Sequence, residues 1–446
     1  MPFSGACFIL VIAGLRQGVY NQWEVWVVVL GMPDIRELLV CRSLLEDDVF
    51  QCLSDCLAKR SAEGARSECV SRLIVQAETL GLGGNVLAGY LLYRLVVDDN
   101  IAARMLDETG GRIGESLHRA FRHDIALLSP LLQDKPSAFL PTDILDDYHP
   151  TRDRLAARTK GAAMLAGILR RPWTVESLAD ALLDFYRQYG SGDLALYRAF
   201  RWDANQGLVG IEHFEPVQLT HLIGYMEQKK QLMSNTLAFL GGRPANNVLL
   251  VGARGTGKSS SVKALANEYF DQGLRLVQIT KPQLTDLARI LATLRRFATK
   301  RFIVFLDDLS FEESEVEYKY LKSAIEGGVE SRPDNVLIYA TSNRRHLIKE
   351  TWRDREDGQD ELYMADSVNE TISLSDRFGL IIHFRTPNQN EYLAIIDHYL
   401  RAAGVILSPE ELRVAGHRWE IEHSGRSGRT ARQFVEHYLG VLRKGD

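Results

Sequence analysis

The sequence predicts an α/β protein whose parallel sheet is preceded and followed by mostly helical regions. Up to about Arg201, apolar residues recur at the three- and four-residue spacing of amphipathic helices. From residue 248 to residue 384, short apolar runs alternate with amphipathic segments, which is typical of a parallel sheet wrapped by helices. From Pro387 onward the helical spacing returns. We therefore expect three domains: a mostly helical N-terminal domain over 1–205, an α/β core over 206–386 and a helical C-terminal domain over 387–446.

Length and composition are those of a globular protein with more than one core. The chain has 446 residues, of which 46% are hydrophobic and 25% are charged, and a single core rarely grows beyond about 250–300 residues. The formal net charge of −5 gives no overall positive field of the kind that holds a protein on nucleic acid. A nucleic-acid partner is therefore not supported by charge, although a local basic patch would permit one.

Two apolar runs near the N-terminus are too short to cross a membrane. The runs 6–15 and 25–32 each have about half of the ~20 residues that a spanning helix requires. No basic residue precedes the first run and no small-residue cleavage site is evident, which argues against a signal peptide. We expect the runs to be either buried elements or an extension outside the fold, and the protein to be cytoplasmic with no membrane partner.

The cysteines predict free thiols. An odd number of cysteines in a long chain argues against a disulfide framework. Cys52 and Cys56 are separated by three residues, but no second pair of Cys or His follows at the spacing of a zinc finger. We expect buried thiols in a reducing cytosol at all five positions, which are Cys7, Cys41, Cys52, Cys56 and Cys69.

The elements follow in order from periodicity and from helix-ending signals. The N-terminal domain is expected to contain helices over 71–84, 86–97, 113–132 and 175–189. A short extended segment is expected over 207–216, and the next helix, over 223–242, ends at Gly241 and Gly242. Strands over 246–252, 274–280, 301–308, 336–343 and 380–384 then alternate with helices over 258–269, 282–296 and 317–328, with a polar, acidic insertion at 354–366. The last helices cover 390–400, 408–419 and 430–442, and Ser408, Pro409 and Glu411 give the second of them a capping box.

A phosphate-binding loop is predicted between the strand over 246–252 and the helix that follows. Residues 252–259, GARGTGKS, match the pattern G-x-x-x-x-G-K-[ST] in the required strand–loop–helix context. Glycines allow backbone N–H groups to face a phosphate, and the positive N-terminal end of the helix adds to the attraction. Lys258 is expected to contact the β- and γ-phosphates and Ser259 to bind Mg²⁺. The predicted phosphate-binding residues are Gly252, Ala253, Arg254, Gly255, Thr256, Gly257, Lys258, Ser259 and Ser260.

Polar residues at the ends of two later strands complete the predicted site. Asp307 follows an all-apolar strand, where a carboxylate is costly unless it is paired or bound to metal, and is expected to assist in holding Mg²⁺. Asp308 is expected to polarise the attacking water; a helix N-cap is the alternative for it, and Glu312 or Glu313 are possible substitutes in catalysis. Asn343 ends the strand over 336–343, where its amide could orient a water.

The order of these motifs resembles the AAA+ ATPase superfamily of P-loop proteins over residues 215–446. The resemblance implies that Ile223 and Tyr225, in "IGYMEQKKQL", lie near the adenine of ATP. "LSDRFG" is similar to a segment of the bacterial branch-migration motor, which implies that Arg377 is an arginine finger acting on a neighbouring subunit; a surface pair with Asp376 is the alternative. "SGRSGRTARQF" resembles the lid helix that carries sensor 2, which implies γ-phosphate contact by Arg429, with Arg432 and Arg426 as alternatives.

A narrower resemblance concerns a bacterial family of stand-alone AAA+ proteins of unknown function. It rests on "NNVLLVGARGTGKSS", "DDLSFEE" and "RPDNVLIYATSNRRHL". This narrower resemblance implies nucleotide binding and the fold but names no biological task. From the resemblance to AAA+ ATPases we expect a homo-oligomeric ATPase that uses ATP and Mg²⁺ to remodel or regulate a macromolecular partner. Two alternatives stay open: an ATP-gated switch that hydrolyses slowly, consistent with the short side chain of Asp308, and a DNA-associated loader or motor. Residues 281–300 lack the aromatic–hydrophobic–glycine loop of protein-threading relatives, which disfavours polypeptide threading.

Overall fold

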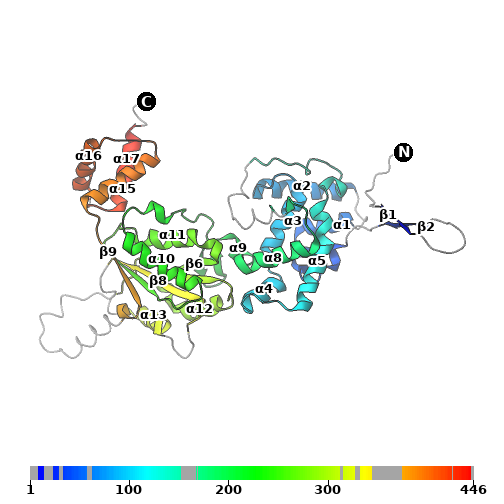
Figure 1. Ribbon diagram of the computed structural model, residues 1–446, viewed down its shortest axis with the longest axis horizontal. Helices are drawn as coiled ribbons and strands as arrows, with labels where there is room; N and C mark the ends of the chain where they lie inside the picture. Colours follow the sequence, from blue (N-terminus) through cyan, green and yellow to red (C-terminus); the bar gives the residue numbers. More distant parts are fainter. Residues whose placement is uncertain are drawn as a thin grey trace. The chain divides into compact units, whose positions relative to one another are not determined.

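The protein is described from a computed structural model in which the chain forms two compact units, Met1–Leu196 and Tyr197–Asp446 (Figure 1). The structure describes residues 9–14, 24–29, 34–57, 63–151, 167, 169–311, 315–326, 332–343, 374–423 and 425–442. The predicted insertion at 354–366, together with Cys7, Glu312 and Glu313, lies outside these residues. Among the helices so described, none has both the length and the apolar character needed to cross a bilayer.

The first unit is built mainly from helices, as predicted. Within the described residues, its helices of eight residues or more are α1 (Asp48–Leu57), α2 (Glu63–Leu80), α3 (Val86–Val97), α4 (Ile101–Glu108), α5 (Glu115–Gln133) and α8 (Val175–Tyr189), and the short α9 (Asp193–Leu196) ends the unit. The helix α8 shows how the sequence specifies such an element. Thr174 and Ser177 form a capping box at its start, and Leu178, Leu182 and Phe185 are buried along one face.

The two apolar runs at the N-terminus contain strands. β1 (Ile9–Gly14) pairs antiparallel with β2 (Glu24–Val29), with Ile9 opposite Val29 and Gly14 opposite Glu24. β-branched residues make up half of β1 and most of β2, and such residues suit a pleated backbone better than a helix. We predicted buried elements or an extension here, without specifying a hairpin. The hairpin also differs from the mostly helical structure predicted for this part of the chain.

The second unit contains a seven-stranded sheet with the order β4-β3-β6-β7-β8-β5-β9. Neighbouring strands are parallel except for β3 and β4, which are antiparallel. The strands are β3 (Ala199–Asp203), β4 (Gly207–Gly210), β5 (Val248–Gly252), β6 (Leu274–Ile279), β7 (Arg301–Leu306), β8 (Val336–Ser342) and β9 (Leu380–Phe384). The predicted parallel sheet is thus confirmed, and the extended segment after residue 207 is β4.

The start of the second unit differs from the boundary predicted at 205/206. β3 falls within the predicted N-terminal domain, but it pairs with β6 and is therefore part of the sheet. Its burial alternates at Arg201, which is exposed between the buried Phe200 and Trp202. A strand of five residues with a central arginine gives too short a pattern to be distinguished from the helical residues before it.

Helices cover both faces of the sheet and so bury its apolar strands. In Figure 1, α10 (Met226–Leu240) and α11 (Lys258–Glu268) lie on one face, whereas α12 (Leu287–Arg295) and α13 (Glu317–Glu326) lie on the other. Phe239 of α10 and Leu265 of α11 join one apolar cluster with alternate strand residues such as Leu250 and Phe305. Because both faces are covered, β7 and β8 are apolar almost throughout, as expected for buried parallel strands.

Three helices form the C-terminal subdomain that the sequence predicts, here called the lid. They are α15 (Gln389–Ala402), α16 (Pro409–Glu422) and α17 (Gly428–Leu442). Ser408 and Glu411 form the predicted capping box at the start of α16. The lid has its own apolar cluster, in which Tyr392 and Ile396 of α15 pack with Phe434 of α17.

Candidate functional site

The strand order brings the predicted motifs to one edge of the sheet. β8 lies between β5 and β7, and all three strands are parallel, so their carboxyl ends meet at the same edge. The predicted phosphate-binding loop follows β5, Asp307 follows β7 and Asn343 follows β8. Crevices at the carboxyl ends of parallel strands are where open α/β sheets bind ligands.

Glycines in the loop have conformations that other residues rarely adopt. The φ angles of Gly252, Gly255 and Gly257 are 150°, 75° and 89°. A Cβ atom on Gly252 would lie 2.0 Å from the carbonyl oxygen of Phe384 on the neighbouring strand β9. The loop can therefore pass this strand only because the residue has no side chain.

Lys258 begins α11 and its ammonium group is enclosed by acceptors. The side chain is only 6% exposed. Its Nζ donates to the carbonyl oxygens of Gly252, at 2.8 Å, and Ala253, at 2.7 Å, and to Oδ1 of Asn343 at 3.0 Å. Burial lowers the pKa of Lys258, and the nearby carboxylates of Asp308 and Asp307 oppose that shift. A cation thus lies at the centre of the loop.

Two hydroxyl groups converge on the carboxylate of Asp307. Oδ1 of Asp307 accepts hydrogen bonds from the Ser259 hydroxyl at 2.5 Å and from the Thr341 hydroxyl at 2.6 Å. The set consists of hard oxygen atoms, which are the ligands that Mg²⁺ prefers. Ser259 and Asp307, predicted from separate motifs, are therefore brought into direct contact.

Asp308 and Asn343 contact one another beside Lys258. Nδ2 of Asn343 donates to Oδ1 of Asp308, while Oδ1 of Asn343 accepts from Lys258. The backbone of Asp308 is left-handed, with φ of 53°, and its N–H donates to the Thr341 hydroxyl at 2.9 Å. The residues from Leu309 to Phe311 are not helical, so the structure gives no support to the helix N-cap alternative for Asp308.

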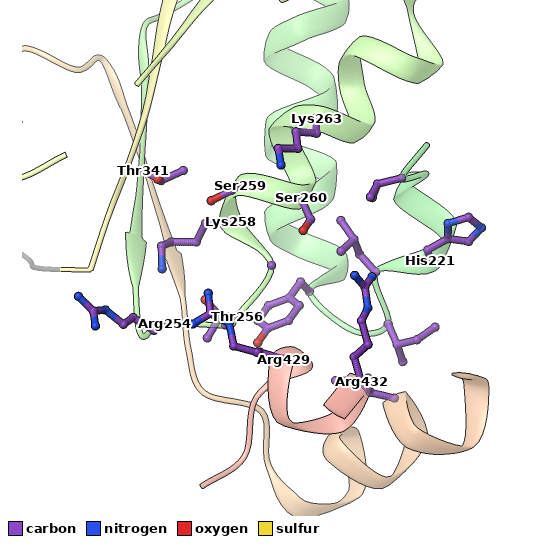
Figure 2. Close-up of a pocket in the computed structure, with 18 of the residues that line it drawn as sticks. His221, Arg254, Thr256, Lys258, Ser259, Ser260, Lys263, Thr341, Arg429 and Arg432 are labelled. Atoms are coloured by element: carbon purple, nitrogen blue, oxygen red, sulfur yellow. The ribbon is translucent and has the colours of Figure 1, made fainter. Parts of the chain in front are cut away.

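A cavity of about 710 Å³ lies next to these groups and is lined both by residues of the sheet edge and by residues of the lid (Figure 2). This volume is within the range of about 300–1,000 Å³ that is usual for small-molecule sites. Among the described residues that line it, the cations outnumber the carboxylates. The cationic side chains are Arg254, Lys258, Lys263, Arg429 and Arg432, and the carboxylates are Asp307, Asp308 and Glu436. The surplus of positive charge suits a polyanionic ligand.

Most of the predicted phosphate-binding residues line this cavity. Six of the nine lie in the continuous run from Gly255 to Ser260, and Arg254 precedes them. Gly252 and Ala253 are not part of the lining, and their carbonyl groups instead accept from Lys258.

Apolar and aromatic side chains line another part of the cavity. Ile223 and Tyr225, both predicted to lie near the adenine, line it together with Ile395 and Tyr399 of the lid helix α15. The Tyr225 ring lies 5.1 Å from the ring of Phe384, and its hydroxyl donates to the carbonyl of Arg385 at 2.9 Å. This combination of aliphatic and aromatic surface is suited to a planar heterocycle.

The lid contributes arginines to the opposite wall of the cavity. Arg429 and Arg432 lie one turn apart on α17, and Figure 2 shows Arg432 extending from α17 toward the start of α11. Arg432 also lies 3.7 Å from Glu215 and 5.5 Å from the centre of the Tyr399 ring. Arg426 does not line the cavity and pairs with Glu420 at 2.9 Å. Among the predicted alternatives, the geometry therefore favours Arg429 and Arg432 over Arg426.

Arg377, the predicted arginine finger, does not line the cavity of its own chain. Its guanidinium forms an ion pair with Glu326 at the end of α13. The Arg377 side chain is 23% exposed, so it is accessible at the surface of the unit.

Several lining residues were not found from the sequence. Thr341 positions both Asp307 and the backbone of Asp308, although a threonine within a strand gives no distinctive signal. Lys263 lies one turn after Ser259 on α11 and pairs with Glu215 at 3.1 Å. The other missed positions are Val217, His221, Leu222, Ile395, Tyr399, Gly428, Gln433 and Glu436. For Lys263 alone, its place on the helix that follows the loop could have indicated a role.

Comparisons with known proteins give one matching family and a set of similar solved structures. The model of a family described as a protein of unknown function, DUF815, matches residues 195–442. No curated protein matches the chain significantly. Solved structures of Thermotoga maritima RuvB are similar: a variant has 21% identity and a TM-score of 0.37 over 52% of this chain and 68% of that chain. The RuvB Holliday junction branch migration motor has 21% identity and a TM-score of 0.36 over 52% and 67%.

Proposed function

Because the chain belongs to the DUF815 family, whose description gives no function, we propose a function from the site itself: binding of Mg²⁺ and ATP. One observation carries the proposal. Four residues from three separate segments line one cavity in two hydrogen-bonded pairs, Lys258 with Asn343 and Ser259 with Asp307. Nothing in the packing of the sheet requires a buried lysine next to a carboxylate at this position, whereas phosphate binding does.

The residues present fit both the nucleotide and the metal ion. Backbone N–H groups of the loop precede α11, whose N-terminal end carries partial positive charge, and Lys258 adds a full charge. Ser259 and Asp307 would hold Mg²⁺ through oxygen atoms, as the ion requires. The bound ion would neutralise charge on the phosphate oxygens. The cavity wall formed by Ile223 and Tyr225 would accept the adenine.

Hydrolysis of ATP is the reaction that this arrangement favours. Asp308 would accept a proton from an attacking water, and Asn343, which is hydrogen-bonded to Asp308, would orient that water. Arg429 and Arg432, from the lid, would contact the terminal phosphate and link its presence to the lid position. Such a linkage would let hydrolysis move the lid against the sheet and so remodel or regulate a macromolecular partner.

A slow, ATP-gated switch is a second candidate, and one contact favours it. The carboxylate of Asp308 accepts from Asn343, whose own carbonyl accepts from Lys258. In this arrangement both groups that could act on a water are engaged with protein partners. A protein that keeps this arrangement with ATP bound would bind the nucleotide well and cleave it slowly.

Assembly with a second copy would complete the catalytic site. Arg377 does not line the cavity of its own chain and is partly exposed, as expected for a residue that acts on a neighbour. To do so it must leave Glu326, and a partly exposed ion pair of this kind contributes little to stability. We therefore propose a homo-oligomer in which Arg377 of one subunit approaches the nucleotide of the next.

Calorimetric titration with ATP in magnesium tests binding, with Lys258→Ala as the disabled variant. The matched control is Lys281→Ala, because Lys281 is also partly buried and bonded to a backbone carbonyl, at 2.9 Å, but lies outside the cavity. Wild type and control should bind one ATP per chain and Lys258→Ala should not. Equal binding by all three proteins would refute the proposed site. A steady-state ATPase assay then separates the two candidates, since activity at background with intact binding supports the switch.

A further inference from the structure

Three cysteine side chains meet in the first unit, far along the chain from the phosphate-binding loop. Cys52 and Cys56 lie one turn apart on α1, and Cys69 lies on the adjacent helix α2. Their sulfur atoms all lie within 4.8 Å of one another. Cys69 is hydrogen-bonded to both of the other thiols. In the sequence, Cys52 and Cys56 are not followed by a second pair of Cys or His at metal-binding spacing. The fold brings a third sulfur, that of Cys69, from a different helix.

The separation and setting of these sulfurs match those of metal-bound thiolates. With a metal–sulfur bond of about 2.3 Å, two thiolates on one tetrahedral ion lie roughly 3.8 Å apart, which is within the observed limit. Residues four apart on a helix share one face, so α1 presents both of its sulfurs to α2 without distortion. Cys56 is 4% exposed and Cys69 is fully buried, whereas Cys52 is half-buried. The group is thus enclosed on two sides and reachable from solvent on the third.

The ligand set is entirely soft. Among the described residues, no His, Asp or Glu joins the three sulfurs at ligand distance. Sulfur ligands select Zn²⁺ and Cu⁺ over Mg²⁺ and Ca²⁺, which prefer oxygen. Arg72, on α2, pairs with Glu68 at 2.8 Å and adds a weaker electrostatic interaction with Cys52.

We propose that Cys52, Cys56 and Cys69 bind one thiophilic d¹⁰ metal ion, Zn²⁺ or Cu⁺, which fastens α1 to α2. Binding converts three thiols to thiolates and releases three protons to solvent, with no change in oxidation state. For Zn²⁺ a water entering beside Cys52 would supply the fourth ligand, whereas Cu⁺ would be satisfied by three sulfurs. The site is separate from the proposed ATP site and would stabilise the N-terminal unit.

The test uses the whole chain, reduced, stripped of metal and handled without oxygen. Co²⁺ serves as a spectroscopic probe of zinc sites, because thiolate ligands give it an intense ultraviolet charge-transfer band. We expect the band to saturate at one Co²⁺ per chain and to disappear when one equivalent of Zn²⁺ is added. Cu⁺ is titrated separately against a chromogenic chelator, again with an expected stoichiometry of one.

Cysteine variants show whether these three residues are the ligands. Cys52→Ser, Cys56→Ser and Cys69→Ser should each weaken binding at least tenfold, and the matched control Cys41→Ser, at a buried cysteine outside the group, should not. Far-UV circular dichroism checks that each variant is folded, and Cys52→Ser is the mildest because its side chain is half-buried. Saturable binding that Cys69→Ser retains, or no one-to-one binding of Co²⁺, Zn²⁺ or Cu⁺ by the wild type, would overturn the proposal.

Discussion

The backbone N–H of Gly428 donates a hydrogen bond of 2.9 Å to the carbonyl oxygen of Gly255. Gly428 is the first residue of the lid helix α17, and Gly255 lies in the middle of the phosphate-binding loop. The lid therefore contacts the loop directly, through main-chain atoms, next to the arginines that line the cavity. This contact provides a physical route by which a change in the loop can alter the lid.

Gly428→Pro should weaken nucleotide binding through this contact. Proline removes the N–H donor but is well tolerated at the first position of a helix. A hydrogen bond of this kind contributes about 0.5–1.5 kcal/mol, so we expect ATP affinity to fall by roughly twofold to tenfold in calorimetric titration.

The matched control for this change is Gly428→Ala, which adds a Cβ and keeps the N–H. The added Cβ would lie 3.2 Å from the same carbonyl oxygen, so the control also measures the effect of crowding. If the two variants bind ATP equally, the hydrogen bond does not couple the lid to the loop.

Gly255→Ala should disturb the lid as well as the loop. Gly255 has φ of +75°, and a Cβ there would lie 2.8 Å from Oγ of Ser427. A left-handed alanine costs about 1–2 kcal/mol by itself, and the contact with the lid adds to this cost. We expect a lower free energy of unfolding and a large loss of ATP affinity.

Gly404→Ala isolates the backbone strain in that experiment. Gly404 has φ of +81°, and a Cβ there would meet nothing within 4 Å. The control should therefore lose stability without losing ATP affinity. Equal effects of the two changes on chemical denaturation and on ATP titration would show that the space beside Ser427 is unimportant.

The sequence was sufficient to predict the parts of the site that depend on short motifs at strand ends. The loop from Gly252 to Ser259, Asp307 and Asn343 each follow an apolar strand, and parallel strands must deliver such residues to one edge. Most helices and strands of the second unit were also predicted, since their apolar runs are long and periodic.

What the sequence could not predict depends on contacts between distant segments. The bond from Gly428 to Gly255 and the ion pair of Arg377 with Glu326 join elements that only the tertiary fold brings together. For the same reason, the sequence did not predict that Cys69 lies beside Cys52 and Cys56. Strand β3 was missed because five residues with a central Arg201 carry too little periodic signal.

Asp308→Asn should separate hydrolysis from binding. Asparagine has nearly the same shape and tolerates the left-handed backbone of Asp308, whose φ is 53°, but it cannot accept a proton from water. We expect the ATP hydrolysis rate to fall by about 10²-fold with ATP affinity within a few-fold of wild type. A variant as active as the wild type would exclude Asp308 as the base.

Arg377→Ala should abolish ATP hydrolysis, and mixing it with the inactive variant Lys258→Ala should restore part of the activity. Arg377→Ala keeps its own Lys258, and Lys258→Ala keeps its own Arg377, so a mixed oligomer would contain complete composite sites. We expect each variant alone to be inactive, and an equimolar mixture to recover a fraction of the wild-type ATPase rate. A mixture as inactive as its components would contradict action between subunits.

Lys258→Met should change the pH dependence of stability in the absence of nucleotide. Burial lowers the pKa of Lys258 in the folded protein below its ordinary value of 10.5. Between the pKa of Lys258 in the folded protein and its pKa in the unfolded chain, the unfolded chain binds more protons than the folded protein. In that interval Lys258 therefore makes the free energy of unfolding rise with pH. Below the folded-state pKa, Lys258 is charged in both states and its burial opposes folding. Methionine removes both effects. Urea denaturation from neutral pH to pH 10.5 should therefore show wild-type stability improving relative to the variant as pH rises, and a constant difference would refute the role of burial.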